Sequence, residues 1–181
     1  MAEMTLHTVE TAPESTKKTL AEIEKNYGFL PNLFGYLAES PTALNAYLDI
    51  NDQLMKHSSL SPAQVQLTLL AISAENHCEF CVAAHSWGTK MANANSQSVE
   101  QLRAGEDVTD AKDAALVNFA RAVVRERGFV DPSVTDAFFA AGYTAANLYD
   151  VLVCNMLKAL SNYTNHITHT EINPELQSFA R

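Results

Sequence analysis

Apolar residues recur along this chain at the three- and four-residue spacing of amphipathic helices, and the alternation typical of strands is hard to find anywhere. Glycine and proline fall mostly between these periodic segments. The pattern therefore predicts an all-α protein. The expected helices cover about residues 14–27, a short segment ending near 40, 41–57, 62–75, a segment from about 78, 99–102, 109–127, a segment from 132 to before 142, and 144–166.

Residue types at the expected helix ends support these boundaries. Three helix starts place a Ser or Asp at the N-cap and a proline at the first helical position, where its missing N–H costs nothing: Ser40-Pro41, Ser61-Pro62 and Asp131-Pro132. Three helices are followed by a glycine that can stop them: Gly28, Gly128 and Gly142. The helix over 62–75 is apolar on most sides, so we expect it to be buried.

The length of 181 residues suits one well-filled core and is short for two. We therefore expect a single helical domain over residues 1–181, with about 1–12 as a flexible N-terminal arm. The composition, 47% hydrophobic and 18% charged, is typical of a globular protein.

The charge balance narrows the classes of partner. Twelve Lys and Arg against 21 Asp and Glu give a net charge of -9, which repels phosphate backbones and anionic lipid. Nucleic acid and membrane are therefore not expected as partners. The first residues lack a basic region followed by an apolar run, and no apolar stretch approaches about 18 residues, so we expect a cytoplasmic protein. In a reducing compartment a close cysteine pair is more plausibly catalytic or metal-binding than structural.

Reactive side chains concentrate between residues 74 and 87, which hold two of the three cysteines, two of the six histidines and the only tryptophan. If a helix starts here, Cys78, Cys81 and His85 stand at i, i+3 and i+7 and share one face. Asn76 is a suitable N-cap, and Glu79 three positions later completes a variant of the capping box. Cys78 would then lie in the first helical turn.

This arrangement has the outline of a redox site. The positive end of the helix favours a thiolate at Cys78 directly and at Cys81 less strongly. His85 can serve as a base or an ion-pair partner. One thiolate would attack an oxidant or a disulfide, and the second sulfur would resolve the intermediate.

Other interpretations of the reactive residues remain open. The cysteines could simply pack, as we expect for Cys154. Zinc could take Cys78, Cys81 and His85, with Glu75 or His77 as a fourth ligand, although a second Cys/His pair is missing. His166 and His169, with Glu171 nearby, could bind a metal or cap the last helix. We expect neither a metal nor a cofactor, and the sequence contains no glycine-rich phosphate loop.

The spacing Glu75-x-x-Cys78-x-x-Cys81-x-x-x-His85 resembles the alkylhydroperoxidase D branch of the carboxymuconolactone decarboxylase superfamily, whose decarboxylase branch lacks the cysteine pair. The resemblance runs from about residue 20 to 175 and includes features of the longer, peroxidase-related members. These are the segments 27–34, 40–41, 60–62 and 162–166.

The resemblance implies an all-helical, alkylhydroperoxidase D-like bundle that assembles as a homo-oligomer, often a trimer or hexamer. It also implies an antioxidant peroxidase that reduces hydroperoxides with electrons from a dithiol or a disulfide reductase. Cys81 would be the peroxidatic cysteine, assisted by His85. Cys78, nearer the surface, would resolve the sulfenic acid and receive the electrons.

Two positions depart from that family's pattern. Gln66 stands where its proton-relay glutamate is expected, and Phe80 replaces a second histidine. Glu75 could act as the acid instead, or be a helix-terminal glutamate. Three alternatives to peroxide reduction follow: general thiol–disulfide exchange, decarboxylase or lactone chemistry if both cysteines are inert, and metal binding if purified protein holds about one metal per chain.

Overall fold

The computed structural model describes residues 4–181, in which helices are joined by loops and no strand occurs. The all-α prediction is confirmed. The elements are α1 (Glu14–Tyr27), α2 (Asn32–Leu37), α3 (Pro41–His57), α4 (Pro62–Glu75), α5 (Glu79–Met91), α6 (Ser96–Ala104), α7 (Ala111–Arg125), α8 (Pro132–Ala140), α9 (Ala145–Thr168) and a 3₁₀ turn, η1 (Pro174–Phe179).

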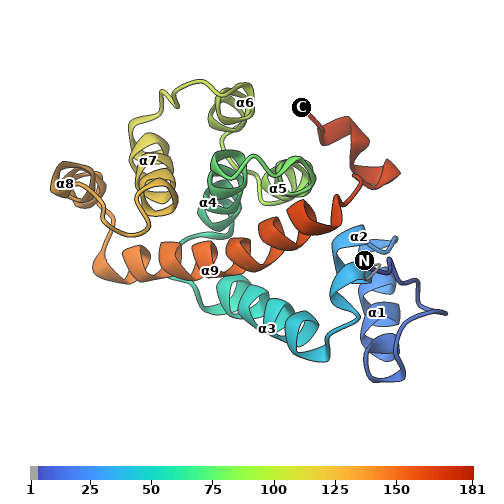
Figure 1. The fold of residues 1–181 in the computed structure, drawn as a ribbon. Coiled ribbons are helices and arrows are strands. Elements are labelled where there is room, and N and C mark those ends of the chain that lie inside the picture. The colour runs from blue at the N-terminus through green and yellow to red at the C-terminus, as the bar shows by residue number, and fades with distance from the viewer. Residues whose placement is uncertain (1–3) are drawn as a thin grey trace.

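The core is built around α4, which packs against α5, α7 and α9. Residues Val65 and 67–74 of α4 are buried, as its apolar sequence predicts. The long helix α9 crosses the molecule with α4 and α5 on one side and α3 on the other (Figure 1). Its C-terminal part lies beside α2, and η1 at the C-terminal end packs against α5.

The expected helix starts form as the sequence predicts. The side chains of Ser40, Ser61 and Asp131 each accept a hydrogen bond from a backbone N–H in the first turn of the following helix. Gly28 ends α1 with a φ of 80°, a left-handed conformation that glycine adopts without a Cβ penalty.

The start of the helix that carries the cysteines differs from the prediction. Asn76 is not an N-cap: α4 continues to Glu75, and the chain then reverses with His77 at a φ of 56°. His77 N–H donates to Ala74 O and Cys78 N–H to Ser73 O, which is the Schellman pattern of a helix C-terminus. The Asn76 amide donates to Asn162 Oδ1 at 2.9 Å instead, and Cys78 becomes the N-cap of α5.

The segment before α1 is the predicted flexible arm, and residues 1–3 of it lie outside the described residues. Its later part contacts α2: His7 N–H donates to Gly35 O at 3.2 Å. A Cβ at Gly35 would lie 2.6 Å from His7 O, so this close approach requires glycine. The flexibility of the arm stays a prediction.

The two faces of α9 are sharply different. Its inner face is buried and includes Lys158 among apolar and amide side chains. Its outer face exposes a stripe of large apolar residues, namely Tyr149, Leu152, Met156, Tyr163 and Ile167. Within residues 4–181 no single helix is long and apolar enough to cross a membrane, and α8 with α9 meets that test only as a pair bent by 119°.

Candidate redox site

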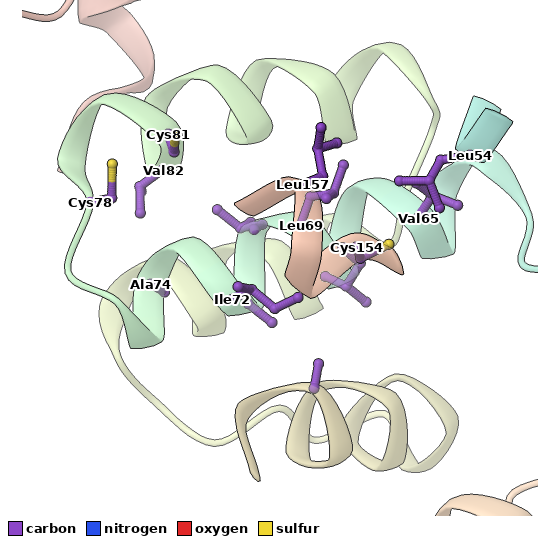
Figure 2. Close-up of a cluster of buried hydrophobic side chains, with 14 of the residues drawn as sticks. Leu54, Val65, Leu69, Ile72, Ala74, Cys78, Cys81, Val82, Cys154 and Leu157 are labelled. Atoms are coloured by element: carbon purple, nitrogen blue, oxygen red, sulfur yellow. The ribbon is translucent and has the colours of Figure 1, made fainter. Parts of the chain in front are cut away.

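The two cysteines of the motif lie together under α9. Cys78 is 2% exposed and Cys81 1% exposed. Asn165 of α9 reaches both sulfurs through one amide nitrogen, 3.6 Å from Cys78 Sγ and 3.2 Å from Cys81 Sγ. Figure 2 shows this pair at one end of the buried cluster, with Cys154 away from it beside Leu157 and Val65. Cys154 is fully buried in the core, as expected for an apolar thiol.

His85, one turn beyond Cys81, is held by two side chains from other helices. Its Nδ1 lies 3.0 Å from Gln66 Oε1, and its Nε2 lies 2.8 Å from Lys158 Nζ. An amide oxygen can only accept, so Nδ1 carries the proton and Nε2 accepts from Lys158. Burial and the Lys158 charge both hold the pKa of His85 well below its usual value.

The same surroundings make Cys81 the more acidic of the two thiols. Burial opposes its ionisation, but hydrogen bonding from Cys78 and the nearby charge of Lys158 outweigh burial and lower the pKa of Cys81 to about 5. Hydrogen bonding to Cys81, together with burial, raises the pKa of Cys78. The side chains around Cys81 therefore outweigh the helix end that favoured Cys78. This order of acidity agrees with the peroxidatic role expected for Cys81, which stays a prediction.

Cys81 faces a cavity of about 100 Å³ whose wall also includes His85 and Lys158. Most of the remaining wall is aromatic or aliphatic, contributed by Tyr27, Phe29, Leu33, Phe34, Tyr47, Phe80, Trp87 and Leu176. Several of these rings are in contact, with centroids 6.0 Å apart for Tyr27 and Trp87. Burial and the Cys81 charge raise the pKa of Tyr47 well above its usual value. The cavity therefore suits a small apolar molecule that approaches Cys81.

Cys78 lines a different depression, which does not include Cys81. Its walls come from the start of α5 and the end of α9: Glu79, Phe80, Asn165, His166, His169 and Thr170. The two sulfurs thus line two different cavities. For the alternative metal role of His166 and His169, the described residues contain no group of three His, Cys, Asp or Glu side chains that could hold a metal ion.

The Glu75 side chain pairs with arginines of α7 rather than with the cysteines. Its carboxylate accepts from Arg125 Nε at 2.9 Å and Nη2 at 3.0 Å, and Arg121 Nε lies 3.8 Å away. These contacts tie α4 to α7 and favour a structural role for Glu75. Its role as a catalytic acid stays a prediction.

Lys158 is the residue that sequence reasoning missed. A signal was available: Lys158 stands four residues after Cys154 and four before Asn162, on the face of the last helix that is otherwise buried. Asn162, Asn165 and His166 do attract attention as polar residues on that helix. Their spacing does not say which of them reaches the sulfurs, and the structure selects Asn165.

Comparisons with known proteins identify the fold of this chain. Residues 41–126 match the model of the carboxymuconolactone decarboxylase family. A solved alkylhydroperoxidase AhpD core, an uncharacterized peroxidase-related protein from Ralstonia eutropha JMP134, matches with a TM-score of 0.83 and 23% identity, over 95% of this chain and 92% of that chain. This chain has an alkylhydroperoxidase D-like fold, and the similarity to the carboxymuconolactone decarboxylase family covers residues 41–126.

Two further structures share the alkylhydroperoxidase D-like fold. A peroxidase-related protein from Silicibacter sp. TM1040 has a TM-score of 0.81 at 20% identity, over 97% of this chain and 92% of that chain. The debrominase Bmp8, as a cysteine-to-alanine variant in complex with 2,3,4-tribromopyrrole, has a TM-score of 0.81 at 15% identity, over 99% and 96%. No curated protein matches the sequence. The predicted resemblance is confirmed at the level of the fold, and the family model matches residues 41–126.

Proposed function

We propose that this chain is a thiol-dependent peroxidase that reduces small organic hydroperoxides through Cys81 and Cys78. The observation that carries the proposal is the placement of Cys81 in the wall of the apolar cavity, with a second sulfur sharing its amide donor, Asn165. The lowered pKa of Cys81 supports it, since the thiolate is the nucleophile.

The cycle proceeds in two oxidative steps. The Cys81 thiolate attacks the outer peroxide oxygen, the O–O bond breaks, and Cys81 becomes a sulfenic acid while an alcohol leaves. The Cys78 thiol then attacks the Cys81 sulfur, water leaves, and a disulfide forms. Asn165 Oδ1 is buried and has no hydrogen-bond partner within the described chain. This oxygen is therefore available to accept from the sulfenic O–H or the Cys78 S–H.

A dithiol, or the dithiol of a disulfide reductase, would return the electrons at Cys78. Attack on the Cys78 sulfur expels Cys81 as the leaving thiolate, and the thiol of lower pKa leaves faster. The depression over Cys78 offers the donor access without passing through the apolar cavity. We therefore propose that oxidant and reductant use opposite sides of the same disulfide.

The test is hydroperoxide turnover with cumene hydroperoxide and a dithiol donor. Cys81→Ser should reduce turnover to the uncatalysed background. Cys78→Ser should form a sulfenic acid that dimedone traps, yet fail to turn over. Cys154→Ser is the matched control and should keep wild-type turnover. Equal turnover in the wild type and Cys81→Ser would refute the proposal, and rapid reduction of a protein disulfide without peroxide turnover would favour general thiol–disulfide exchange.

A second candidate is reductive dehalogenation of a small aromatic compound. The likeness to the debrominase Bmp8 and the aromatic wall beside Cys81 favour it. The dithiol would be oxidised to the disulfide while a ring C–Br bond becomes C–H and bromide leaves. Bromide release from a brominated pyrrole, measured with a dithiol donor and absent in Cys81→Ser, would support this activity. Peroxide turnover without bromide release would exclude it.

We also propose that the chain forms a homo-oligomer, such as a trimer or hexamer, through the outer face of α9. Tyr149, Leu152, Met156, Tyr163 and Ile167 follow a helical spacing that puts them on one exposed side. Met156→Glu should therefore shift the mass measured by light scattering toward the monomer. A wild-type monomer at micromolar concentration would contradict this proposal.

A further inference from the structure

Lys158 is a fully buried lysine in the centre of the site, with 0% exposure. An ammonium group in such surroundings is costly unless an anion or several acceptors compensate it. Among residues 4–181, the ion pairs formed by Asp and Glu involve other cations and not Lys158. The carboxylates of the described residues therefore do not supply the compensation.

His85 accepts a hydrogen bond from Lys158 but does not neutralise it. Gln66 Oε1 fixes the proton on His85 Nδ1, so Nε2 presents a neutral lone pair to Lys158 Nζ at 2.8 Å. Gly88 maintains this arrangement, because a Cβ there would lie 2.2 Å from Gln66 Oε1. His85 is thus a fixed hydrogen-bond acceptor that orients the Lys158 ammonium. Its Nε2 is occupied by this hydrogen bond.

The anion that Lys158 meets is Cys81. The nearby charge of Lys158 favours the Cys81 thiolate. Both groups line the apolar cavity, so a molecule that reacts at Cys81 also lies beside the ammonium. Among the described residues, the other titratable groups around this sulfur are Cys78, His85, Tyr27 and Tyr47. None of these four carries a positive charge in its ordinary state at neutral pH, which leaves Lys158 as the cation.

We propose that Lys158 is a catalytic residue: it is the counter-ion of the Cys81 thiolate and the proton donor to the oxygen that leaves when the O–O bond breaks. This role, which rests on the proposed peroxidase function, differs from the one expected for His85. His85 is instead a positioning residue that acts through Lys158.

The proton balance closes over the cycle. The Cys81 thiolate, the hydroperoxide and the Lys158 ammonium give a sulfenic acid, an alcohol and a neutral Lys158 amine. Cys78 S–H and the sulfenic acid give the disulfide and water, with no change at Lys158. The dithiol donor then loses two electrons and two protons to become a disulfide. One proton returns to Cys78 and the other to Lys158, which restores the thiol, the thiolate and the ammonium.

The role predicts a loss of activity without a large loss of stability. Lys158→Met has a similar length and no charge, and Cys81 can take up a proton once its counter-ion is gone. No unpaired charge then stays buried, so the melting temperature should change little. Loss of the counter-ion should raise the pH midpoint of Cys81 ionisation by about one to three units. Loss of the proton donor should lower kcat/KM for cumene hydroperoxide by about 10²–10⁴-fold.

The experiment compares the wild type, Lys158→Met, and the exposed control Lys56→Met. Thiolate absorbance at 240 nm is titrated on the reduced proteins, with Cys81→Ser to identify the step that belongs to Cys81. Cumene hydroperoxide turnover and melting temperature are measured on the same samples. Lys158→Gln, which keeps a polar donor without a charge, replaces the methionine variant if that protein does not fold.

A raised midpoint and a loss of turnover in the Lys158 variant, with neither in Lys56→Met, would support the inference. An unchanged midpoint with unchanged turnover would overturn it. A raised midpoint in a protein whose wild type does not reduce hydroperoxides would uphold the counter-ion role and overturn the peroxidase function. A marked fall in melting temperature with an unchanged midpoint would show a structural role and overturn the catalytic one.

Discussion

Asn165 on α9 donates its amide N–H to Cys81 Sγ on α5 across 3.2 Å, although the two residues are 84 positions apart in the chain. The same nitrogen lies 3.6 Å from Cys78 Sγ. One carboxamide on the buried face of α9 thus contacts both sulfurs of the motif at the start of α5. The reactivity of the pair therefore depends on a helix that the motif does not contain.

Replacing Asn165 by Leu should weaken the Cys81 thiolate. A hydrogen bond to a charged group contributes roughly 1.5–3 kcal/mol, so its loss should raise the pKa of Cys81 by about one to two units. Titration of thiolate absorbance at 240 nm measures this shift. Asn162→Leu is the control, because Asn162 is buried on the same helix but bonds to Asn76. Equal shifts in the two variants would mean that the effect comes from packing.

The pH dependence of the first oxidation step should follow Cys81. Its pKa is lowered to about 5, so the thiolate is present above that pH and is lost as the pH falls through it. Single-turnover sulfenic acid formation should therefore be constant from about pH 6 to 8 and fall about tenfold per unit well below pH 5. Burial raises the pKa of Cys154 to about 12, so Cys154→Ala should leave the profile unchanged. A rate that climbs steadily to pH 9 would contradict the assignment.

Gly88→Ala should disturb the site through Gln66. The new Cβ would meet Gln66 Oε1 at 2.2 Å and move the amide away from His85 Nδ1. Overpacking of this kind costs about 1–3 kcal/mol, and hydroperoxide turnover should fall with it. Urea unfolding gives the stability change. In the double variant Gln66→Ala with Gly88→Ala the clash is absent, so the two stability losses should be clearly less than additive. Simple additivity would mean that Gly88 acts elsewhere.

The Glu75→Gln variant tests whether the Glu75 carboxylate has a structural or a catalytic role. The Glu75 side chain pairs with Arg125, which is itself largely exposed, so its loss should cost no more than about 1 kcal/mol. We expect peroxide turnover within about twofold of the wild type, because an acid acting in the reaction would contribute about 10²-fold or more. Arg125→Ala removes only the more exposed of the two ion pairs that Glu75 forms, so it should lose no more stability than Glu75→Gln and should match it in turnover. A large loss of turnover in Glu75→Gln alone would restore the catalytic role.

Local sequence information predicted most of the secondary structure. The apolar periodicity located the helices, and the caps at Ser40 and Ser61 gave two starts correctly, since both features act within a few residues. The cap at Asn76 was misplaced, because α4 extends to Glu75 and the Schellman turn through His77 uses the backbone groups that a cap would need. Both helix assignments are locally acceptable there, and the Asn76–Asn162 contact favours the observed one.

The sequence by itself determined the helical class, the cysteine pair and the position of His85 one turn beyond Cys81, because helical periodicity fixes neighbours within one element. Only the tertiary structure decided what surrounds the sulfurs. Lys158 and Asn165 arrive from α9, Gln66 from α4 and Tyr27 from the end of α1. Charge, hydrogen bonding and burial at Cys81 come from these distant residues, so the choice of Cys81 over Cys78 as the thiolate depends on packing between helices, which their local spacing does not encode.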